Sequence, residues 1–121
     1  MVTIDKNSPP TSIEVESFLK EISFNLPLGF IDFFKEANGA DISSDTKYII
    51  LWPLTDMIQL NKQYNVNEYA PEFFIFGSDG GDTAYAIEKG TSHIFEMPFI
   101  GMSKEEATFI CNSFDDLIKN I

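Results

Sequence analysis

Few residues in this chain have the types and spacing that catalysis needs. A nucleophilic triad requires a histidine as its base, and the single histidine, His93, opens an apolar stretch that is typical of a strand. The single cysteine, Cys111, follows two apolar residues, and a free cysteine in such surroundings usually behaves as a small buried hydrophobe. The chain has no arginine, and no lysine lies closer to Cys111 in sequence than Lys104, so no neighbouring charge indicates a reactive thiolate. We therefore predict that the protein is not an enzyme.

The segment SDGGD, residues 78–82, is the best candidate for a metal or phosphate site. Asp79 and Asp82 carry hard oxygen ligands, but their spacing departs from the EF-hand pattern. The pair Gly80 and Gly81 lacks the following Lys-Ser or Lys-Thr of a phosphate loop, and the two carboxylates would repel phosphate. One histidine and one cysteine do not supply a structural zinc site. We expect turn residues here, with no metal and no cofactor.

Length and composition predict one globular domain over residues 1–121, with residues 1–10 as a loose lead-in. The chain is 44% apolar and contains twelve phenylalanines, enough for a sizeable core. No apolar run approaches 18 residues, and the first residues lack the pattern of a signal peptide. A single cysteine excludes an internal disulfide and fits a reducing compartment. These features favour a cytoplasmic protein.

The charge is strongly negative. Nineteen acidic residues stand against eight lysines, giving a net charge of −11. Such a balance opposes binding to phosphate backbones, so we expect neither a nucleic-acid nor a membrane partner. It favours long-range attraction to a basic protein. Solubility alone is the competing explanation for this charge.

A hairpin over Phe73–Ile87 is predicted at the centre of the fold. The strands Phe73–Phe76 and Ala84–Ile87 flank a loop of about six residues rich in Gly and Asp. The first strand is apolar at every position, which indicates a central strand covered on both faces. The hairpin should therefore form the spine of the core.

Helices and further strands are predicted around this hairpin. Thr11 and Glu14 form a capping box for a first helix, and Ser113 with Asp116 forms another before the end of the chain, although Ser103 is an alternative start. Helices at both ends around antiparallel strands predict an α+β domain, mainly an antiparallel sheet with N-terminal and C-terminal helices packed against it. The remaining expectations are a helix from Pro27 to Asn38–Gly39, a loop over 40–46, a strand over Tyr48–Trp52, a helix from Thr55 to about Tyr64, a connection over Asn65–Pro71, a turn over 89–92, a strand over His93–Met97 and extended chain over Thr108–Ile110.

Four segments, in order, resemble motifs of the SUKH superfamily, which includes fungal killer-toxin-resistance and cell-wall glucan-synthesis regulators. They are Leu26–Pro27 with Phe30, Phe33–Phe34 and Asn38–Gly39; Leu51–Leu54 with Asn61; Phe76–Asp82 with Tyr85; and Ser113–Phe114 with Leu117. The resemblance implies an α+β domain with helices packed on a mainly antiparallel sheet. Most bacterial members are immunity proteins of polymorphic toxin systems, which bind and neutralise a cognate toxin domain, often a nuclease.

We therefore hypothesise an immunity protein that binds a basic toxin domain without catalysis. The expected contacts are the hairpin residues and nearby acids, namely Ser78, Asp79, Asp82, Glu68 and Glu72. The alternative is a regulatory or scaffold module, for example in cell-wall glucan synthesis, as the fungal relatives imply. An exposed edge strand or aromatic patch would also permit a homodimer.

Overall fold

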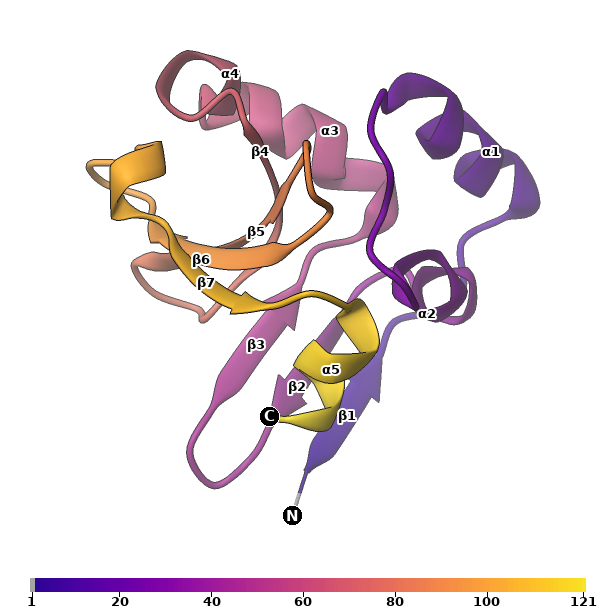
Figure 1. Ribbon diagram of the computed structural model, residues 1–121. Helices are drawn as coiled ribbons and strands as arrows, with labels where there is room; N and C mark the ends of the chain where they lie inside the picture. Colours follow the sequence, from indigo (N-terminus) through magenta and orange to yellow (C-terminus); the bar gives the residue numbers. More distant parts are fainter. Residues whose placement is uncertain (1) are drawn as a thin grey trace.

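The computed structural model describes residues 2–121, which form one antiparallel sheet of seven strands, five α-helices and a short 3₁₀ helix (Figure 1). The strands lie side by side in chain order, from β1 at one edge to β7 at the other. The predicted α+β class with an antiparallel sheet is confirmed. The strands are β1 (Thr3–Lys6), β2 (Ala40–Ser43), β3 (Tyr48–Leu51), β4 (Phe73–Ser78), β5 (Thr83–Glu88), β6 (Ile94–Pro98) and β7 (Thr108–Cys111). The helices are α1 (Ser12–Glu21), α2 (Phe30–Glu36), α3 (Leu54–Gln63), α4 (Val66–Tyr69), η1 (Lys104–Glu106) and α5 (Phe114–Lys119).

β4 is the middle strand of the sheet, and all six of its residues are buried. This confirms the prediction of a central strand covered on both faces. The strand runs two residues further than predicted, because Gly77 and Ser78 pair with Leu51 and Ile50 of β3. The turn to β5 is therefore four residues, 79–82, rather than about six. The end of β4 is therefore set by pairing with β3, a strand that is distant in sequence, and the residues around Gly77 do not predict it.

The predictions for residues 1–10 and 40–46 are wrong where β1 and β2 form. Thr3–Lys6 were expected in a loose lead-in and Ala40–Ser43 in a loop, yet the two strands pair with each other and β2 also pairs with β3. β1 is exposed at all four positions, and β2 alternates between apolar and polar residues over only four positions, too few to identify a strand. β2 is held by its two ladders and by the burial of Ala40 and Ile42, whereas β1 is held mainly by its ladder with β2. Met1 lies outside the described residues.

The helix starts follow the local signals at both ends of the chain. The Thr11 capping box is present, with the Glu14 N–H donating to Thr11 Oγ1 at 3.1 Å and the Thr11 N–H donating to Glu14 Oε1 at 2.8 Å. Ser113 Oγ likewise accepts from the Asp116 N–H at 3.1 Å, so the helix from Ser113 onward is confirmed. The alternative start at Ser103 gives only the single turn η1.

Two interior helices start elsewhere than predicted, and a third was missed. α2 begins at Phe30 rather than near Pro27, because Gly29 adopts a left-handed conformation with φ +89°. α3 begins at Leu54, one residue before the predicted Thr55 cap. The expected connection over 65–71 contains α4, a single short helix that follows the left-handed residue Asn65.

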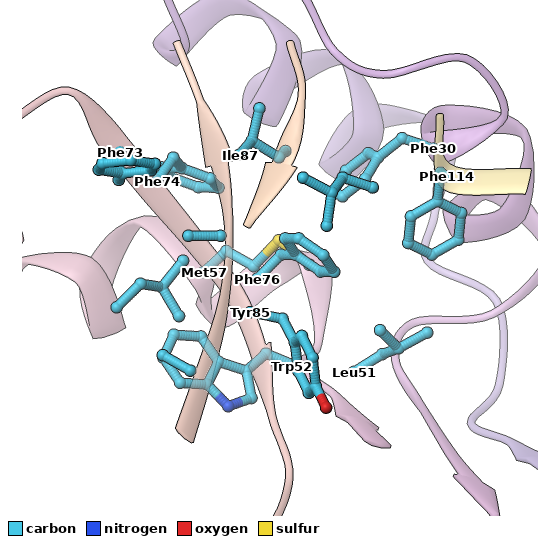
Figure 2. Close-up of a cluster of buried hydrophobic side chains, with 14 of the residues drawn as sticks. Phe30, Leu51, Trp52, Met57, Phe73, Phe74, Phe76, Tyr85, Ile87 and Phe114 are labelled. Atoms are coloured by element: carbon cyan, nitrogen blue, oxygen red, sulfur yellow. The ribbon is translucent and has the colours of Figure 1, made fainter. Parts of the chain in front are cut away.

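Phenylalanine rings from three helices and β4 form the core. Phe30 of α2 lies 5.2 Å from Phe114 of α5 and 5.7 Å from Phe76 of β4, measured between ring centroids. Figure 2 shows these rings together, and Figure 1 shows α2 beside α5. Phe18 of α1 reaches the same core through Phe74, with centroids 6.0 Å apart. Segments from both ends of the chain are therefore fixed to the central strand.

β3 pairs with β4 over only two residues, after which Pro53 and α3 leave the sheet. Asn61 of α3 replaces the missing strand neighbour. Its Nδ2 donates to the carbonyl of Ile75 and its Oδ1 accepts from the Ile75 N–H, both at 2.8 Å. One side-chain amide thus satisfies both backbone groups of a fully buried β4 residue.

Candidate functional site

The turn between β4 and β5, residues 79–82, is called here the acidic turn. Asp79 Oδ1 accepts from the N–H groups of Gly81 at 2.8 Å and Thr83 at 3.2 Å, and Ser78 Oγ accepts from the Gly80 N–H at 3.2 Å. These bonds hold the backbone of the turn, where Gly80 has a φ of +86°. Ser78 is buried and Asp79 half-buried, whereas Asp82 is exposed. Of the three, Asp82 presents its side chain most freely to a partner.

Three aromatic rings, those of Trp52, Tyr64 and Phe99, contact one another and are called here the aromatic cluster, which the backbone of Phe99 joins to the acidic turn. The Phe99 N–H donates to the carbonyl of Asp82 at 2.9 Å, which fixes the segment after β6 to the turn. The Phe99 ring lies 4.8 Å from the ring of Tyr64, at the end of α3, and 6.3 Å from Trp52. Trp52 and Tyr64 stack with centroids 5.9 Å apart and an interplanar angle of 13°.

The side chains of the aromatic cluster differ in solvent exposure, from a buried base to an exposed rim. Trp52 is only 9% exposed, whereas Tyr64 is 44% exposed and the adjoining Ile100 is 86% exposed. The exposed Tyr64 and Ile100, the half-buried Phe99 between them and the exposed Asp82 are called here the binding patch. Aromatic side chains with a rigid buried base, next to charged groups at the rim, are typical of protein-binding surfaces. The patch is therefore suited to bind a protein with complementary positive charge.

Sequence reasoning predicts Asp82 as a contact but not Tyr64, Phe99 or Ile100. Tyr64 follows α3, whereas Phe99 and Ile100 follow β6, so only the tertiary structure brings the two segments together. The available signal was weak. Three large apolar residues close to predicted turns or helix ends have no place in a helical stripe or an alternating strand, and such residues are candidates for exposed patches.

Glu68 and Glu72 lie at the opposite end of β4 from the acidic turn. Both are exposed, and the length of β4 separates Glu72 from Ser78 by roughly 20 Å. Glu68, on α4, lines a groove of about 580 Å³ together with Lys62 and Lys89. The structure thus brings Ser78, Asp79 and Asp82 together and places the other two predicted contacts elsewhere.

His93 and Cys111 do not face each other. Cys111 pairs with Ile94, the residue after His93, so the two side chains lie on opposite faces of the β6–β7 pair. The His93 ring instead contacts Phe109, with centroids 5.5 Å apart. Burial raises the pKa of the Cys111 thiol, whose Sγ lies 3.3 Å from the carbonyl of Ser113. The arrangement offers no assembled nucleophile and base.

Across residues 2–121, no group of three or more His, Cys, Asp or Glu side chains is placed to hold a metal ion. None of the helices in this range is long and apolar enough to cross a membrane. The chain is strongly acidic, and the binding patch is one of several places where large apolar side chains are exposed.

The meander sheet, its packed helices and the binding patch define a small α+β domain with a surface suited to protein binding. The model of the SMI1 / KNR4 family (SUKH-1) matches residues 9–120, and the chain belongs to this family. A search of curated proteins gave no match. The family match confirms the SUKH resemblance, and the family includes both immunity proteins and regulators of the Smi1/Knr4 type. Asn61, part of one resembling segment, is the residue that bonds both backbone groups of Ile75.

Proposed function

We propose that this protein is an immunity protein that binds a cognate toxin domain and neutralises it without catalysing a reaction. The toxin is a basic domain such as a nuclease, because an enzyme that holds nucleic acid carries lysine and arginine around its site. Membership of a family that includes immunity proteins supports this function. The net charge of −11 supports a basic partner, since opposite charges speed association. Neutralisation takes place in the cytoplasm.

The observation that carries the proposal is the binding patch. The exposed Tyr64 ring contacts the ring of Phe99, the Phe99 N–H is bonded to the carbonyl of the exposed Asp82, and the next residue, Ile100, is exposed. A lysine or arginine of the toxin gains a cation–π contact with the rings and an ion pair with the carboxylate. Ile100 supplies the apolar contact that excludes water around them.

The other acidic residues have different parts in this proposal. Ser78 and Asp79 shape the acidic turn through their hydrogen bonds to its backbone, so they act by positioning Asp82. Glu68 and Glu72 contribute to the long-range attraction from the far end of β4. We expect charge changes at these two positions to alter the association rate more than the dissociation rate.

The test is a pull-down from the native host with this protein as bait, read by mass spectrometry at low and moderate salt. The expected result is one stoichiometric partner with a basic domain, retained less well as salt rises. Co-expression of that domain with the immunity protein should then rescue growth. Recovery of no basic partner, or of a basic partner whose toxicity is unaffected, would refute the proposal.

Two matched variants locate the interface. Ile100→Asp lies in the binding patch and should weaken the complex at least about tenfold, as a charge placed among interface anchors does. Ile13→Asp is the control, because Ile13 is a comparably exposed isoleucine, at 73%, on α1. Equal affinity of both variants for the toxin would exclude the binding patch as the interface.

A regulatory or scaffold module, for example in cell-wall glucan synthesis, is the second candidate. The matching family is named for regulators of that type, which is the observation that favours it. Recovery of only wall-synthesis or signalling proteins in the same pull-down, with no protection against a toxin, would establish this function instead.

A further inference from the structure

The free edge of β1 is a second surface with the geometry of a binding site. β1 is the outermost strand at its side of the sheet and pairs with β2 through Thr3↔Ser43, Ile4↔Ile42, Asp5↔Asp41 and Lys6↔Ala40. The Asn7 N–H donates to the carbonyl of Gly39 at 3.0 Å, which continues the same register. In an antiparallel pair, bonded residues alternate, so the odd-numbered residues of β1 bond to β2. The N–H and C=O groups of Ile4 and Lys6 therefore point away from the sheet.

The hydrogen bonds between β2 and β3 lead to the same assignment of inward-facing and outward-facing residues. The Ser44 N–H donates to the carbonyl of Lys47 at 2.8 Å, so the even-numbered residues of β2 bond to β3 and its odd-numbered residues are left for β1. Two independent hydrogen bonds thus agree that the backbone groups of Ile4 face outward. All four residues of β1 are exposed, and Ile4 is 40% exposed.

The side chains beside this edge carry negative charge on one face of the sheet. Asp5 lies directly opposite Asp41, and both are exposed. Like charges directly opposite each other destabilise a sheet, and a cation placed between or beside them relieves that repulsion. The Tyr48 hydroxyl donates to Asp41 Oδ2 at 3.3 Å and adds an exposed ring on the same face. Asp41 thus already accepts a hydrogen bond from Tyr48, whereas Asp5, on the outermost strand, is the carboxylate nearest to an added strand.

The other face of β1 has a different chemistry. Ile4 alternates with Asp5 and lies opposite the fully buried Ile42, at the margin of the core. Lys6, on the same face as Ile4, reaches back to α2, with Nζ 3.7 Å from Glu36 and 5.5 Å from the centroid of the Phe33 ring. A strand added at this edge would meet a carboxylate on one face and an apolar side chain on the other.

We propose that the β1 edge binds an extended segment of a basic partner protein, which adds to the sheet as a further strand. The segment alternates basic and apolar residues, so that a lysine or arginine lies opposite Asp5 and an apolar side chain lies opposite Ile4. Main-chain bonds to Ile4 and Lys6 supply the affinity, and the alternating side chains supply the specificity. This surface is separate from the binding patch, and the inference does not depend on the partner being a toxin.

A second copy of the chain is a less suitable occupant of the β1 edge, and the β7 edge is a less suitable site for an added strand. A second copy of this chain would bring another net charge of −11 to the edge, which opposes self-pairing. The opposite edge, β7, has a register shift between Ile94 and Phe95 of its partner strand, and such a bulge twists an edge away from further pairing. The pairs between β1 and β2 are regular along the whole strand.

The test titrates a capped hexapeptide of alternating lysine and valine into the full chain and follows backbone amide signals by NMR. The expected shifts are confined to β1 and its neighbours in β2, and the affinity falls as salt rises. A hexapeptide of alternating glutamate and valine is the control for charge. Shifts centred on another surface, no shift in β1 at millimolar peptide, or equal binding of the acidic peptide would overturn the proposal.

The Ile4→Pro variant tests the backbone contact. It removes an N–H that faces outward, where an edge strand tolerates proline, so the fold should persist. We expect lysine–valine peptide binding to weaken at least about tenfold, because a carbonyl of the added strand loses the N–H that donates to it and meets the proline ring instead. Ile4→Thr keeps the N–H and is the matched control. Should Ile4→Pro fail to fold, the same peptide N-methylated on its valines replaces it, because the valines lie opposite Ile4 and Lys6 and their N–H groups would point at β1.

The charge contact has its own pair of variants. Asp5→Asn should weaken the lysine–valine peptide about two- to fivefold, as expected for one cross-strand ion pair, and Glu105→Gln, at an exposed site in η1, should not. Undiminished binding to Ile4→Pro or to the N-methylated peptide would overturn the proposal. A dimer in sedimentation that Ile4→Pro abolishes would also overturn it, because a second copy would then occupy the edge.

Discussion

Replacing Asn61 by alanine tests how β4 is held at Ile75, where β5 pairs with it on one side but β3 no longer pairs with it on the other. The side chain makes three hydrogen bonds, each 2.8 Å long, to the carbonyl of Met57 and to the N–H and C=O of Ile75. The carbonyl of Met57 lies inside α3 and is also the acceptor for the helical N–H four residues on. The alanine variant therefore leaves two backbone groups of Ile75 without their partner.

The expected loss in the free energy of unfolding follows from the burial of Ile75, which is 0% exposed. An unsatisfied buried backbone group costs about 1–3 kcal/mol, so two groups give roughly 2–6 kcal/mol. Asn61 lines the groove of about 580 Å³, from which a water molecule can reach part of the vacated site and lower that cost. We expect a loss of about 2–4 kcal/mol in the free energy of unfolding. For a chain of this size the melting temperature should fall by about 8–15 °C.

The assay is urea denaturation followed by circular dichroism, with thermal melts as a second measure. Asn67→Ala is the matched control, because Asn67 lines the same groove but is exposed, and its loss should stay within about 0.5 kcal/mol. The Ile75 amide should also exchange its hydrogen faster in Asn61→Ala than in the wild type. A loss below about 0.5 kcal/mol with unchanged exchange at Ile75 would refute the view that Asn61 replaces a strand neighbour.

Three further predictions concern the sheet and its titratable groups. Gly77→Ala should cost about 2–3 kcal/mol in urea denaturation, because its Cβ would lie 2.5 Å from the carbonyl oxygen of Ile50, whereas Gly90→Ala, with nothing within 4 Å, should be neutral. Burial, reinforced by two nearby carboxylates, raises the pKa of Tyr85 above its ordinary 10.0. The folded state then holds the Tyr85 proton to higher pH than the unfolded state, so stability should fall as the pH rises above 10.0, and less steeply in Tyr85→Phe. Because burial also raises the pKa of Cys111, iodoacetamide should alkylate the folded protein at neutral pH more slowly than the protein in urea.

Local signals were sufficient for the elements whose stabilisation is local. The Thr11 capping box and the Ser113 cap place α1 and α5, because a cap satisfies backbone donors within three residues of itself. The uninterrupted apolar run of β4 predicted its burial on both faces, since no polar side chain is present to face water. Composition also predicted the phenylalanine core.

Local signals failed where long-range pairing decides the structure. β1 is exposed at every position, so no apolar alternation marks it, and only pairing with β2 makes it a strand. β2 contributes two buried positions in four residues, too few for a period to be visible. α2 starts at Phe30 rather than near Pro27 for another reason. Gly29 adopts a left-handed conformation, which the residue type allows but does not by itself predict.

The sequence alone determined the fold class, the acidity and the family of this protein. These follow from composition, from caps and apolar runs, and from motifs that keep their order along the chain. The tertiary structure decided which residues share a surface. It brought Tyr64, Phe99 and Asp82 together, moved Glu68 and Glu72 to the far end of β4, and left one edge of β1 open. Contacts between distant segments depend on how the elements pack in three dimensions, and the spacing of residues along one chain does not record that packing.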